Sequence, residues 1–350
     1  MKLMEIMEKL DYEEVVYFYD RESGLKAIVA IHDTTLGPAL GGTRMWPYSS
    51  EEEALRDVLR LSRGMTLKAA AAGLDLGGGK AVIMGDSCKD KTEKLLRAYA
   101  RCIDSLGGRY ITAEDVGIGQ DDIDIIRQET RYVTGFSGGS GDPSPYTARG
   151  VWQGIRAAVK TRFGSDSLKG LTVAVQGLGN VGYNLCRLLY QEGVNLIVSD
   201  INSFAAEKAA GEFRAKIVDA PDIIGAECDI FAPCALGGVI NSRTIPLLRC
   251  QIIAGSANNV LEDDAAGEEL LRSNILYVPD FIINAGGVIN VAEDVAADGY
   301  NQERVLKKVD RIYYAVLEVI NLSREQGIPT SRAADLVALQ RINSARPGKS

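Results

Sequence analysis

Apolar residues in the first part of the chain fall into short runs that predict β-strands. Two runs, 15–19 and 25–32, flank a polar turn at 20–24 and are typical of a β-hairpin. Two more runs, 81–84 and 110–113, are bounded by charged residues or glycine. Four strands are therefore expected before residue 114.

Helices are expected where apolar residues recur every three or four positions. Residues 1–12 and 92–106 follow this pattern. A third helix begins at Ser49 or Ser50, either of which can cap it, and glutamates fill its first turn. Its buried face is predicted to carry Leu55, Val58, Leu59 and Leu61. Residues 34–44 contain a Gly-Pro and a Gly-Gly pair and are predicted to form a loop, either with its backbone beside a ligand or as a simple connector.

The second part of the chain alternates apolar strands with helices, which predicts a doubly wound parallel sheet. A stretch dense in Gly, Ser and Pro, 137–145, is the best candidate for a domain linker, and a helix begins beyond it. Strands are predicted at 171–176, 195–199, 230–233, 252–255 and 275–278. One long helix is predicted over 302–326, with an apolar stripe that indicates core or interface rather than a ligand site. Residues 330–350 are expected to form a helix and a polar tail.

Length, charge and cysteine content exclude several classes of protein. A chain of 350 residues, 46% hydrophobic and 25% charged, indicates a globular protein of about two domains. The net charge of −8, without a long basic run, argues against nucleic-acid binding. No apolar run reaches the ~18 residues of a membrane span, and the N-terminus lacks the apolar core of a signal peptide. Six scattered cysteines indicate reduced, mostly buried thiols in a cytoplasmic protein, and the single histidine, His32, argues against a metal site or a His-based triad.

The most specific single motif follows the strand predicted at 171–176. It is Gly177-Leu178-Gly179-Asn180-Val181-Gly182, and a helix and a second strand ending in Asp200 come after it. This order, with an acidic residue about 20 positions on, is the dinucleotide-binding fingerprint. The glycines allow a tight turn and a pyrophosphate close to the helix N-terminus. Asp200 would accept hydrogen bonds from the adenosine ribose and repel a 2′-phosphate, which favours NAD over NADP.

Further ligand contacts are expected in the loops that follow the other strands of this sheet, because ligands bind outside the C-terminal ends of such strands. These loops are 234–238, 256–259 and 284–287. From the first two we predict cofactor contacts by Cys234, Ala235, Ser256, Ala257 and Asn258.

Two lysines lie in a segment of small and apolar residues. Lys68 is followed by a run of alanines, and three glycines, 77–79, precede Lys80. Apolar surroundings and a second nearby ammonium both lower the pKa of a lysine towards that of a general base. The glycines are expected to turn the backbone tightly and to leave Lys80 at the edge of the strand 81–84. The alternative is a surface loop with two solvated lysines.

Two carboxylates, Glu114 and Asp115, follow the strand predicted at 110–113. A carboxylate at a strand end is a candidate for proton transfer. For Asp115 the alternative, a cap for the following turn, is equally compatible with the sequence.

Five segments, which together span nearly the whole chain, resemble the glutamate, leucine, phenylalanine and valine family of amino-acid dehydrogenases, and the members that act on leucine are the most similar. The segments are Leu40–Trp46, Gly77–Ile83, Thr112–Gly117, Pro233–Gly238 and Asn284–Val291. The resemblance implies an α/β protein with two domains and a catalytic cleft between them. The first, over 1–140, would bind substrate and form oligomers, and the helix in 330–350 would pack back on it. The second, over 141–329, would be a Rossmann-type NAD domain.

The resemblance also implies a role for each candidate residue. Lys80 would be the general base that activates water, Asp115 would exchange protons with the amino nitrogen, and Lys68 would pair with the substrate carboxylate. Thr147 and Asn258 would touch the nicotinamide end of the site. The residues expected to contact the rest of the substrate are Leu40, Gly41, Gly42, Ala113, Val288 and Val291.

The activity implied is reversible, NAD-dependent oxidative deamination of L-leucine, L-isoleucine and L-valine by a homo-oligomer, typically an octamer among the leucine-specific members. A preference for phenylalanine or tryptophan is the first alternative. A catalytically inactive NAD-binding regulator is a second, against which the presence of Lys68, Lys80 and Asp115 argues. A hydroxy-acid dehydrogenase would need a histidine near an acid, and His32 lies outside any such context.

Overall fold

The computed structural model describes residues 2–296 and 298–346, and the chain divides into two compact units. Unit 1 comprises Met1–Gly141, Asn290–Asn301 and Ala338–Ser350, and unit 2 comprises Asp142–Ile289 and Gln302–Val337. Over the residues that the structure describes, no helix combines the length and the apolar character needed to cross a membrane.

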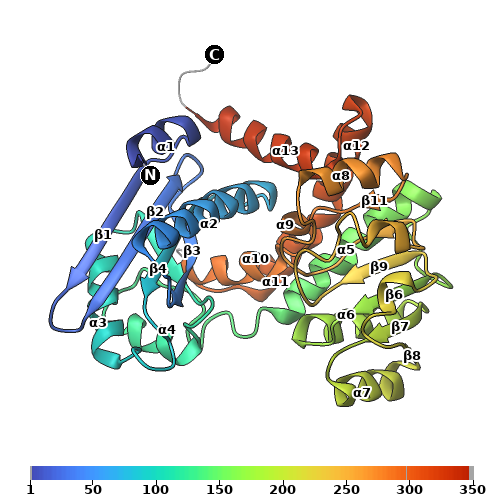
Figure 1. Cartoon of the computed structure of the whole chain (residues 1–350), viewed down its shortest axis with the longest axis horizontal. Coiled ribbons are helices and arrows are strands. Elements are labelled where there is room, and N and C mark those ends of the chain that lie inside the picture. The colour runs from blue at the N-terminus through green and yellow to red at the C-terminus, as the bar shows by residue number, and fades with distance from the viewer. Residues whose placement is uncertain (1, 297, 347–350) are drawn as a thin grey trace. The chain divides into compact units, whose positions relative to one another are not determined.

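Unit 1 is built on a mixed five-stranded sheet (Figure 1). Its strands are β1 (Glu14–Asp20), β2 (Leu25–Asp33), β3 (Ala39–Trp46), β4 (Gly77–Met84) and β5 (Tyr110–Ala113). They lie in the order β1-β2-β4-β3-β5. Strand β2 runs antiparallel to both of its neighbours, β1 and β4, whereas β4, β3 and β5 run parallel to one another. The hairpin of β1 and β2 confirms the prediction from the two apolar runs that flank a turn.

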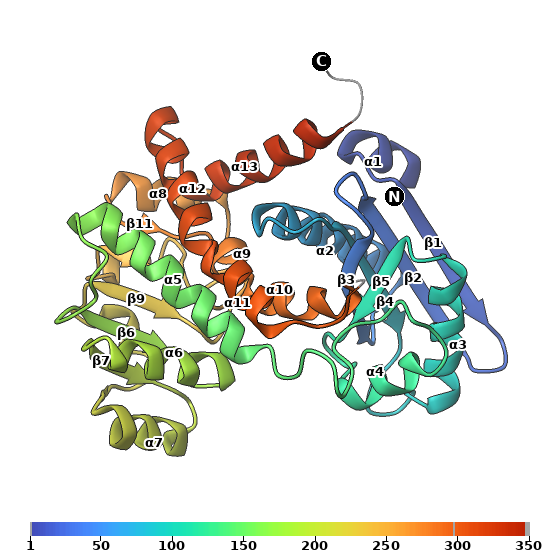
Figure 2. The same cartoon turned by 180° about the vertical axis from the view of Figure 1, so that it is seen from behind.

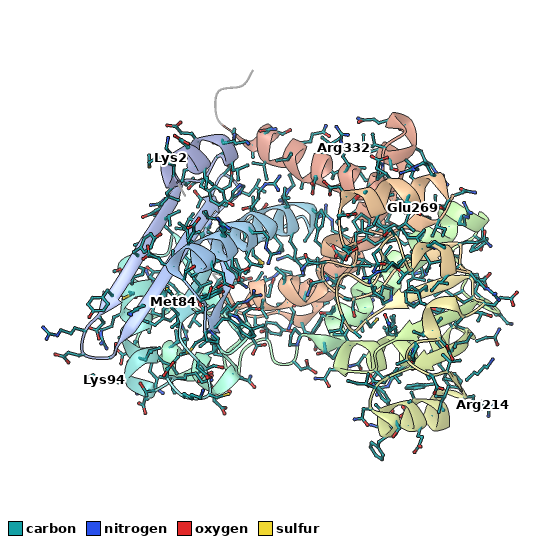
Figure 3. The ribbon with its side chains drawn as sticks, in the orientation of Figure 1. Lys2, Met84, Lys94, Arg214, Glu269 and Arg332 are labelled. Atoms are coloured by element: carbon teal, nitrogen blue, oxygen red, sulfur yellow. The ribbon has the colours of Figure 1, made fainter. Side chains whose placement is uncertain are left out.

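Helices cover both faces of this sheet (Figures 1 and 2). They are α1 (Leu3–Leu10), α2 (Glu51–Ala71), α3 (Glu93–Ser105) and α4 (Gln120–Arg127). Successive residues of β2 point to opposite faces, so that Ile28 packs with α2 and Val29 packs with α3. Ser50 accepts a hydrogen bond from the backbone N–H of Glu53 and caps α2, as the sequence predicted. In Figure 3, Met84 marks the end of β4 and Lys94 the beginning of α3.

Two predictions for unit 1 are wrong. Residues 39–44 are not part of a loop, because they belong to β3, which pairs with β4 on one side and β5 on the other. The three glycines at 77–79 do not turn the backbone, because they are the extended first half of β4, and Lys80 therefore lies inside the strand rather than at its edge. Close packing explains the glycines: a Cβ on Gly78 would lie 2.0 Å from the backbone nitrogen of Thr66 in α2.

Unit 2 is built on a parallel six-stranded sheet. Its strands are β6 (Thr172–Gln176), β7 (Asn195–Ser199), β8 (Lys216–Ile217), β9 (Ile230–Pro233), β10 (Ile252–Ile253) and β11 (Leu276–Tyr277). They lie in the order β11-β10-β9-β6-β7-β8. The chain starts in the middle at β6, builds outward to β8, and then builds the other half from β9. This reversal confirms the predicted doubly wound sheet and creates a topological switch point between β6 and β9.

Most of the remaining helices belong to unit 2. They are α5 (Ser144–Phe163), α6 (Asn180–Gln191), α7 (Ser203–Phe213), α8 (Asp264–Arg272), α9 (Asp280–Ile283), α11 (Gln302–Asp310) and α12 (Ile312–Gln326). In Figure 3, Glu269 lies on α8 and Arg214 follows α7. The boundary between the units falls inside two further helices, α10 (Gly286–Ala292) and α13 (Thr330–Ala345).

The single helix predicted over 302–326 is two helices, α11 and α12, interrupted at Arg311. Next to this break, Asp310 accepts hydrogen bonds from Arg149 at 2.7 and 2.8 Å and from Gln153 at 2.8 Å, both on α5. These hydrogen bonds join segments that are far apart in the sequence, so the spacing of apolar residues within 302–326 does not predict them. The predicted linker 137–145 is also too long, because α5 begins at Ser144 with Pro145 in its first turn.

The close packing of α2 on β4 predicts the effect of a substitution at Gly78 in β4, and Gly64 in α2 provides a control. Gly78→Ala should destabilise the protein by about 1–3 kcal/mol, because the new methyl group would overlap the backbone of Thr66. Gly64→Ala should be neutral or stabilising by up to about 1 kcal/mol, because Gly64 lies in α2 and a Cβ added there would meet nothing within 4 Å. Urea unfolding followed by circular dichroism measures both, and equal midpoints for the two variants would contradict this account of the glycines.

Candidate active site

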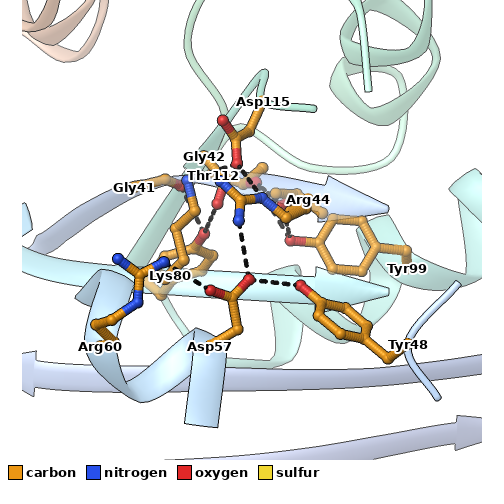
Figure 4. Close-up of polar contacts among 12 residues, drawn as sticks. Gly41, Gly42, Arg44, Tyr48, Asp57, Arg60, Lys80, Tyr99, Thr112 and Asp115 are labelled. Carbon is orange, nitrogen blue, oxygen red and sulfur yellow. Dashed lines mark hydrogen bonds and ion pairs between the residues drawn. The ribbon is translucent and has the colours of Figure 1, made fainter. Parts of the chain in front are cut away.

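Lys80 and Asp115 meet on one face of the sheet of unit 1 (Figure 4). The Nζ of Lys80 lies 2.9 Å from Oδ2 of Asp115. The Lys80 side chain is only 8% exposed, whereas the Asp115 side chain is 24% exposed. A buried ammonium thus has a carboxylate partner that still reaches solvent, which is an arrangement suited to moving protons between a site and its surroundings.

Strand alternation and a tight turn bring the two residues together. Lys80 occupies the same face of β4 as Val82, which packs against α2. Asp115 follows β5 and exchanges two backbone hydrogen bonds with Ile118 around a turn. Gly117 has φ +82° in that turn, and a Cβ added to it would lie 2.4 Å from the carbonyl oxygen of Met45. Glycine is therefore needed for the turn that carries Asp115.

Gly42 lets the end of β5 approach β3. A Cβ on Gly42 would lie 2.4 Å from the carbonyl oxygen of Glu114 and 3.0 Å from the Cβ of Asp115. The neighbouring Gly41 accepts a hydrogen bond of 2.5 Å from the hydroxyl of Tyr110. Both predicted glycines thus lie beside the catalytic candidates, but within a strand.

Arg44 and Asp57 are part of this site, and sequence reasoning assigned them no role. The Nε of Arg44 lies 3.1 Å from Oδ2 of Asp115, and its Nη1 lies 2.9 Å from Oδ2 of Asp57 on α2. Tyr48 donates a hydrogen bond of 2.8 Å to the same oxygen of Asp57. No local sequence signal marked either residue, because the segment with Arg44 was predicted to be a loop and Asp57 is an ordinary acid beside the apolar positions of α2.

Burial and charge shift the pKa values of the central pair. Burial lowers the pKa of the Lys80 ammonium, and the Asp115 carboxylate opposes this shift without cancelling it. Burial raises the pKa of Asp115, but the charges of Lys80 and Arg44 and the hydrogen bond from Lys80 outweigh it, so this pKa lies below its ordinary value. The pair combines a lysine that loses its proton more easily than usual with a carboxylate that stays ionised.

The other substrate-side candidates lie on β3, β5, α2 and α10. Leu40 is buried on β3 and Ala113 is buried on β5, opposite Gly42 in the strand register. Lys68 is half-buried in the last turn of α2, which packs on β4. Val288 and Val291 are half-buried and one helical turn apart on α10. The unit boundary lies between these two valines.

The residues of the predicted dinucleotide fingerprint surround the switch point of unit 2. Gly177 follows β6 with φ +95°, and a Cβ there would lie 2.7 Å from Ala235 in the loop after β9. A Cβ on Gly182 would lie 2.0 Å from the carbonyl oxygen of Gly177. Helix α6 begins at Asn180, earlier than predicted, with Gly179 at its N-cap. The turn and the helix start therefore have the backbone form that accepts a pyrophosphate.

Asp200 lies at the end of β7, beside this turn. Its Oδ2 accepts a hydrogen bond of 2.6 Å from the backbone of Leu178, and its Oδ1 accepts one of 2.8 Å from Asn202. The carboxylate is thereby held next to the glycine turn, where the fingerprint expects the acid that contacts a ribose. Val181 is half-buried in the first turn of α6.

The loops after β9 and β10 meet at the same end of the sheet. The backbone N–H of Cys234 donates to Gln176 at 2.7 Å, and Ala257 N–H donates to Pro233 at 3.0 Å. Asn284, which was not among the predicted site residues, donates to the Ser256 carbonyl at 3.1 Å and to the Asn258 side chain at 2.8 Å.

The Oδ1 of Asn284 is buried and has no hydrogen-bond partner within the described part of the chain. An orphaned acceptor between these loops fits an amide donor such as that of a nicotinamide. The signal that could have found Asn284 was the segment 284–287, which the sequence predicted as a ligand-side loop; in the structure Asn284 follows α9, and residues 286–287 begin α10. Thr147 is half-buried near the start of α5, and its hydroxyl donates to the Pro143 carbonyl at 3.1 Å.

The remaining chemistry-bearing residues have structural partners. His32 is buried, with its ring nitrogens 2.9 Å from the Thr66 hydroxyl and 3.1 Å from the Leu10 carbonyl, and burial lowers its pKa. All six cysteines are free: Cys186 and Cys250 are buried, Cys88 is exposed, and the other three are partly buried. The prediction of mostly buried thiols is therefore only partly correct. In the described ranges, no group of His, Cys, Asp and Glu side chains could hold a metal.

Comparisons with known proteins match nearly the whole chain to one family of dehydrogenases. The family model "Glu/Leu/Phe/Val dehydrogenase, dimerisation domain" matches residues 13–132, and "Glutamate/Leucine/Phenylalanine/Valine dehydrogenase" matches residues 138–210 and 199–348. The leucine dehydrogenase of Geobacillus stearothermophilus is 59% identical, with 100% of this chain and 96% of that protein covered. The L-tryptophan dehydrogenase of Nostoc punctiforme is 50% identical over 100% of this chain and 99% of that protein.

Solved structures match as well. The crystal structure of the Nostoc punctiforme L-tryptophan dehydrogenase has a TM-score of 0.90 at 49% identity, covering 98% of this chain and 99% of that chain. The glutamate dehydrogenase of Peptoniphilus asaccharolyticus has a TM-score of 0.77 at 22% identity, covering 97% of this chain and 93% of that chain, and this similarity concerns the fold alone.

The coupling of Lys80 to Asp115 predicts the direction of a pKa change. Asp115→Asn should lower the pKa of Lys80 further, because the neutral amide no longer stabilises the ammonium. Asp57→Asn should shift it in the same direction but less, since the Asp57 charge is a weaker influence on Lys80. NMR titration of protein labelled with ¹³C at lysine Cε measures both shifts. A pKa of Lys80 that stays constant or rises in Asp115→Asn would contradict the pairing.

Proposed function

Because the chain belongs to the Glu/Leu/Phe/Val dehydrogenase family, we propose that it catalyses the reversible oxidative deamination of branched-chain L-amino acids with NAD. An L-amino acid, NAD⁺ and water give a 2-oxo acid, ammonium, NADH and a proton. The observation that carries this proposal is the buried Lys80 paired with Asp115, in a chain that is 57–59% identical to two leucine dehydrogenases. L-Leucine, L-isoleucine and L-valine are the proposed substrates.

The proposed mechanism divides the proton transfers between two residues, Asp115 and Lys80. Asp115, ionised beside Lys80, accepts the proton that the substrate amino group must lose before Cα is oxidised. Lys80, whose pKa burial lowers, acts as the general base that removes a proton from water attacking the resulting iminium carbon. Asp115 then returns its proton to the nitrogen. Lys80, after releasing its first proton to solvent, accepts the remaining hydroxyl proton, so that the C–N bond breaks, ammonia leaves and the carbonyl of the 2-oxo acid forms.

Binding of the substrate is assigned to residues of the same sheet and helix. Lys68, in the last turn of α2, would pair with the substrate carboxylate. The backbone at Gly41 and Gly42 would lie against the substrate, because glycine leaves no side chain in the way. The apolar side chain of the substrate would contact Leu40, Ala113, Val288 and Val291.

The proposed cofactor is NAD. A bound NAD⁺ supplies the acceptor for the hydrogen and electron pair that leave Cα. The pyrophosphate would lie against the residues from Gly177 to Gly182, at the N-terminus of α6. Asp200 would accept hydrogen bonds from the adenosine ribose, and its charge would repel the 2′-phosphate of NADP. The remaining proposed contacts are Thr147, Cys234, Ala235, Ser256, Ala257 and Asn258, to which Asn284 is added.

The family model for residues 13–132 describes a dimerisation domain, which points to assembly of this chain with copies of itself. We propose a homo-oligomer, with an octamer as the specific expectation. We also propose a cytoplasmic location, because six free thiols are compatible with a reducing compartment.

A substrate panel tests the proposed function. Leucine, isoleucine and valine should be oxidised with efficiencies that differ by modest factors, because one methylene in an apolar pocket is worth about 1–3 kcal/mol. Glutamate and lysine should be rejected, because a desolvated charge without a partner costs several kcal/mol. The increase in NADH absorbance measures each rate, and the same assay with NADP should give a much lower efficiency. Higher efficiency on phenylalanine or tryptophan than on leucine would overturn the branched-chain assignment and favour the aromatic alternative.

Two lysine variants separate chemistry from binding. Lys80→Ala should lower kcat about 10²–10⁴-fold, because the general base is lost. Lys68→Ala should chiefly raise the KM for leucine, about 10–100-fold, because a charged hydrogen bond to the substrate is lost. Lys89→Ala is the matched control, since Lys89 is 80% exposed and forms an ion pair with Asp86 in its own loop. A near-normal kcat for Lys80→Ala would remove Lys80 from the mechanism, and an unchanged KM for Lys68→Ala would remove Lys68 from carboxylate binding.

A further inference from the structure

We propose that Arg44, anchored by Asp57, is a positioning residue that fixes the Asp115 carboxylate beside Lys80 for the proton transfers of the proposed reaction. This inference depends on the proposed function and deepens it, since it assigns a role to residues of the site to which the proposed mechanism gives none.

The geometry is a guanidinium that spans two carboxylates (Figure 4). Arg44 donates through Nε to Oδ2 of Asp115 at 3.1 Å and through Nη1 to Oδ2 of Asp57 at 2.9 Å. Oδ2 of Asp115 is also the oxygen that lies 2.9 Å from Nζ of Lys80. Two cations from neighbouring strands, β3 and β4, therefore hold one oxygen of Asp115 from two directions. This restricts rotation of the carboxylate about its side-chain bonds.

Asp57 is itself held in place, so that it can act as the anchor. Its Oδ2 accepts from the Tyr48 hydroxyl at 2.8 Å, and its Oδ1 accepts from Arg60 at 3.0 Å. The side chains of Arg44 and Asp57 are 22% and 15% exposed, so solvent screens their attraction less than at an open surface. A guanidinium is planar and carries donors in a fixed fork, which a lysine ammonium cannot reproduce. The anchor therefore sets the direction in which Arg44 presents Nε to Asp115.

The charge of Arg44 acts on both partners of the catalytic pair in the same direction. The charged groups that face Asp115 are Lys80 from β4 and Arg44 from β3, and behind Arg44 lie Asp57 and Arg60 of α2 with the phenol of Tyr48. The Arg44 charge lowers the pKa of Asp115 and that of Lys80. The proposed reaction needs Asp115 ionised and Lys80 neutral. Loss of this charge would raise both pKa values, and activity would then require a higher pH.

The test compares variants that remove the positive charge of Arg44, replace its guanidinium by an ammonium, or remove the negative charge of Asp57. Arg44→Gln should lower kcat about 10²-fold, with little change in the KM for leucine, and should move the acidic limb of the kcat profile to higher pH. Arg44→Lys should keep the limb near its normal position, because the charge remains, but should not restore kcat. Asp57→Asn should lower kcat without moving the limb to higher pH, because the variant removes a negative charge. Tyr48→Phe should cause a smaller loss of kcat and no shift of the limb.

Arg56→Gln is the matched control, because Arg56 is an exposed arginine of α2 that pairs with Glu52 one turn away, and it should behave as the unmodified enzyme. NMR titration of lysine Cε adds a readout that needs neither substrate nor cofactor: the pKa of Lys80 should rise in Arg44→Gln and stay near normal in Arg44→Lys. If Arg44→Gln does not fold, as judged by circular dichroism, Asp57→Asn and Tyr48→Phe decide through kcat.

The outcomes distinguish this inference from the proposed function. Normal kcat in the Arg44 or Asp57 variants, while the unmodified enzyme oxidises leucine, would overturn the positioning role alone. A lower kcat in Arg44→Gln with an unchanged acidic limb and an unchanged Lys80 titration would also overturn it, since a merely structural defect behaves in that way. Absence of turnover by the unmodified enzyme across the amino-acid panel would overturn the proposed function and this inference with it.

Discussion

A buried lysine needs a counter-charge if it is to hold its proton, and the pairing of Lys80 with Asp115 is the interaction on which the candidate active site depends. Burial alone lowers the pKa of Lys80 and favours the neutral amine. Asp115 favours the ammonium form of Lys80, and Lys80 together with Arg44 favours the ionised form of Asp115. The result is a pair in which burial favours the neutral amine and Asp115 favours the ammonium, so the pKa of Lys80 is lowered but the group can still exchange a proton.

Backbone packing makes this pairing possible. The strand that carries Lys80 begins with three glycines, and α2 lies so close to one of them, Gly78, that any side chain there would overlap Thr66. The end of β5 approaches β3 just as closely at Gly42. Both contacts place side chains of separate elements on the same small area of one sheet face. The positions are precise because they are set by backbone against backbone rather than by flexible side chains.

Unit 2 uses the same principle at the end of its sheet. The reversal of strand order between β6 and β9 leaves the loops after these strands side by side, and Gly177 allows its turn to pack on Ala235. Asp200 and Asn284 then reach this place from further along the chain. The Oδ1 of Asn284 is buried and has no hydrogen-bond partner in the described part of the chain, so it is an acceptor available to a bound group.

The sequence alone determined most of the secondary structure, the doubly wound sheet and the candidate residues of the pair, because apolar periodicity and the glycine fingerprint are local properties of the chain. The sequence-based prediction was wrong at the glycines of β3 and β4. Glycines are common both in turns and where two backbones pack closely, and here they lie in strands that pack closely rather than in the predicted loop and turn. The prediction also gave no role to Arg44 and Asp57. Their function depends on contacts between β3, α2 and the end of β5, and only the tertiary structure brings those segments together.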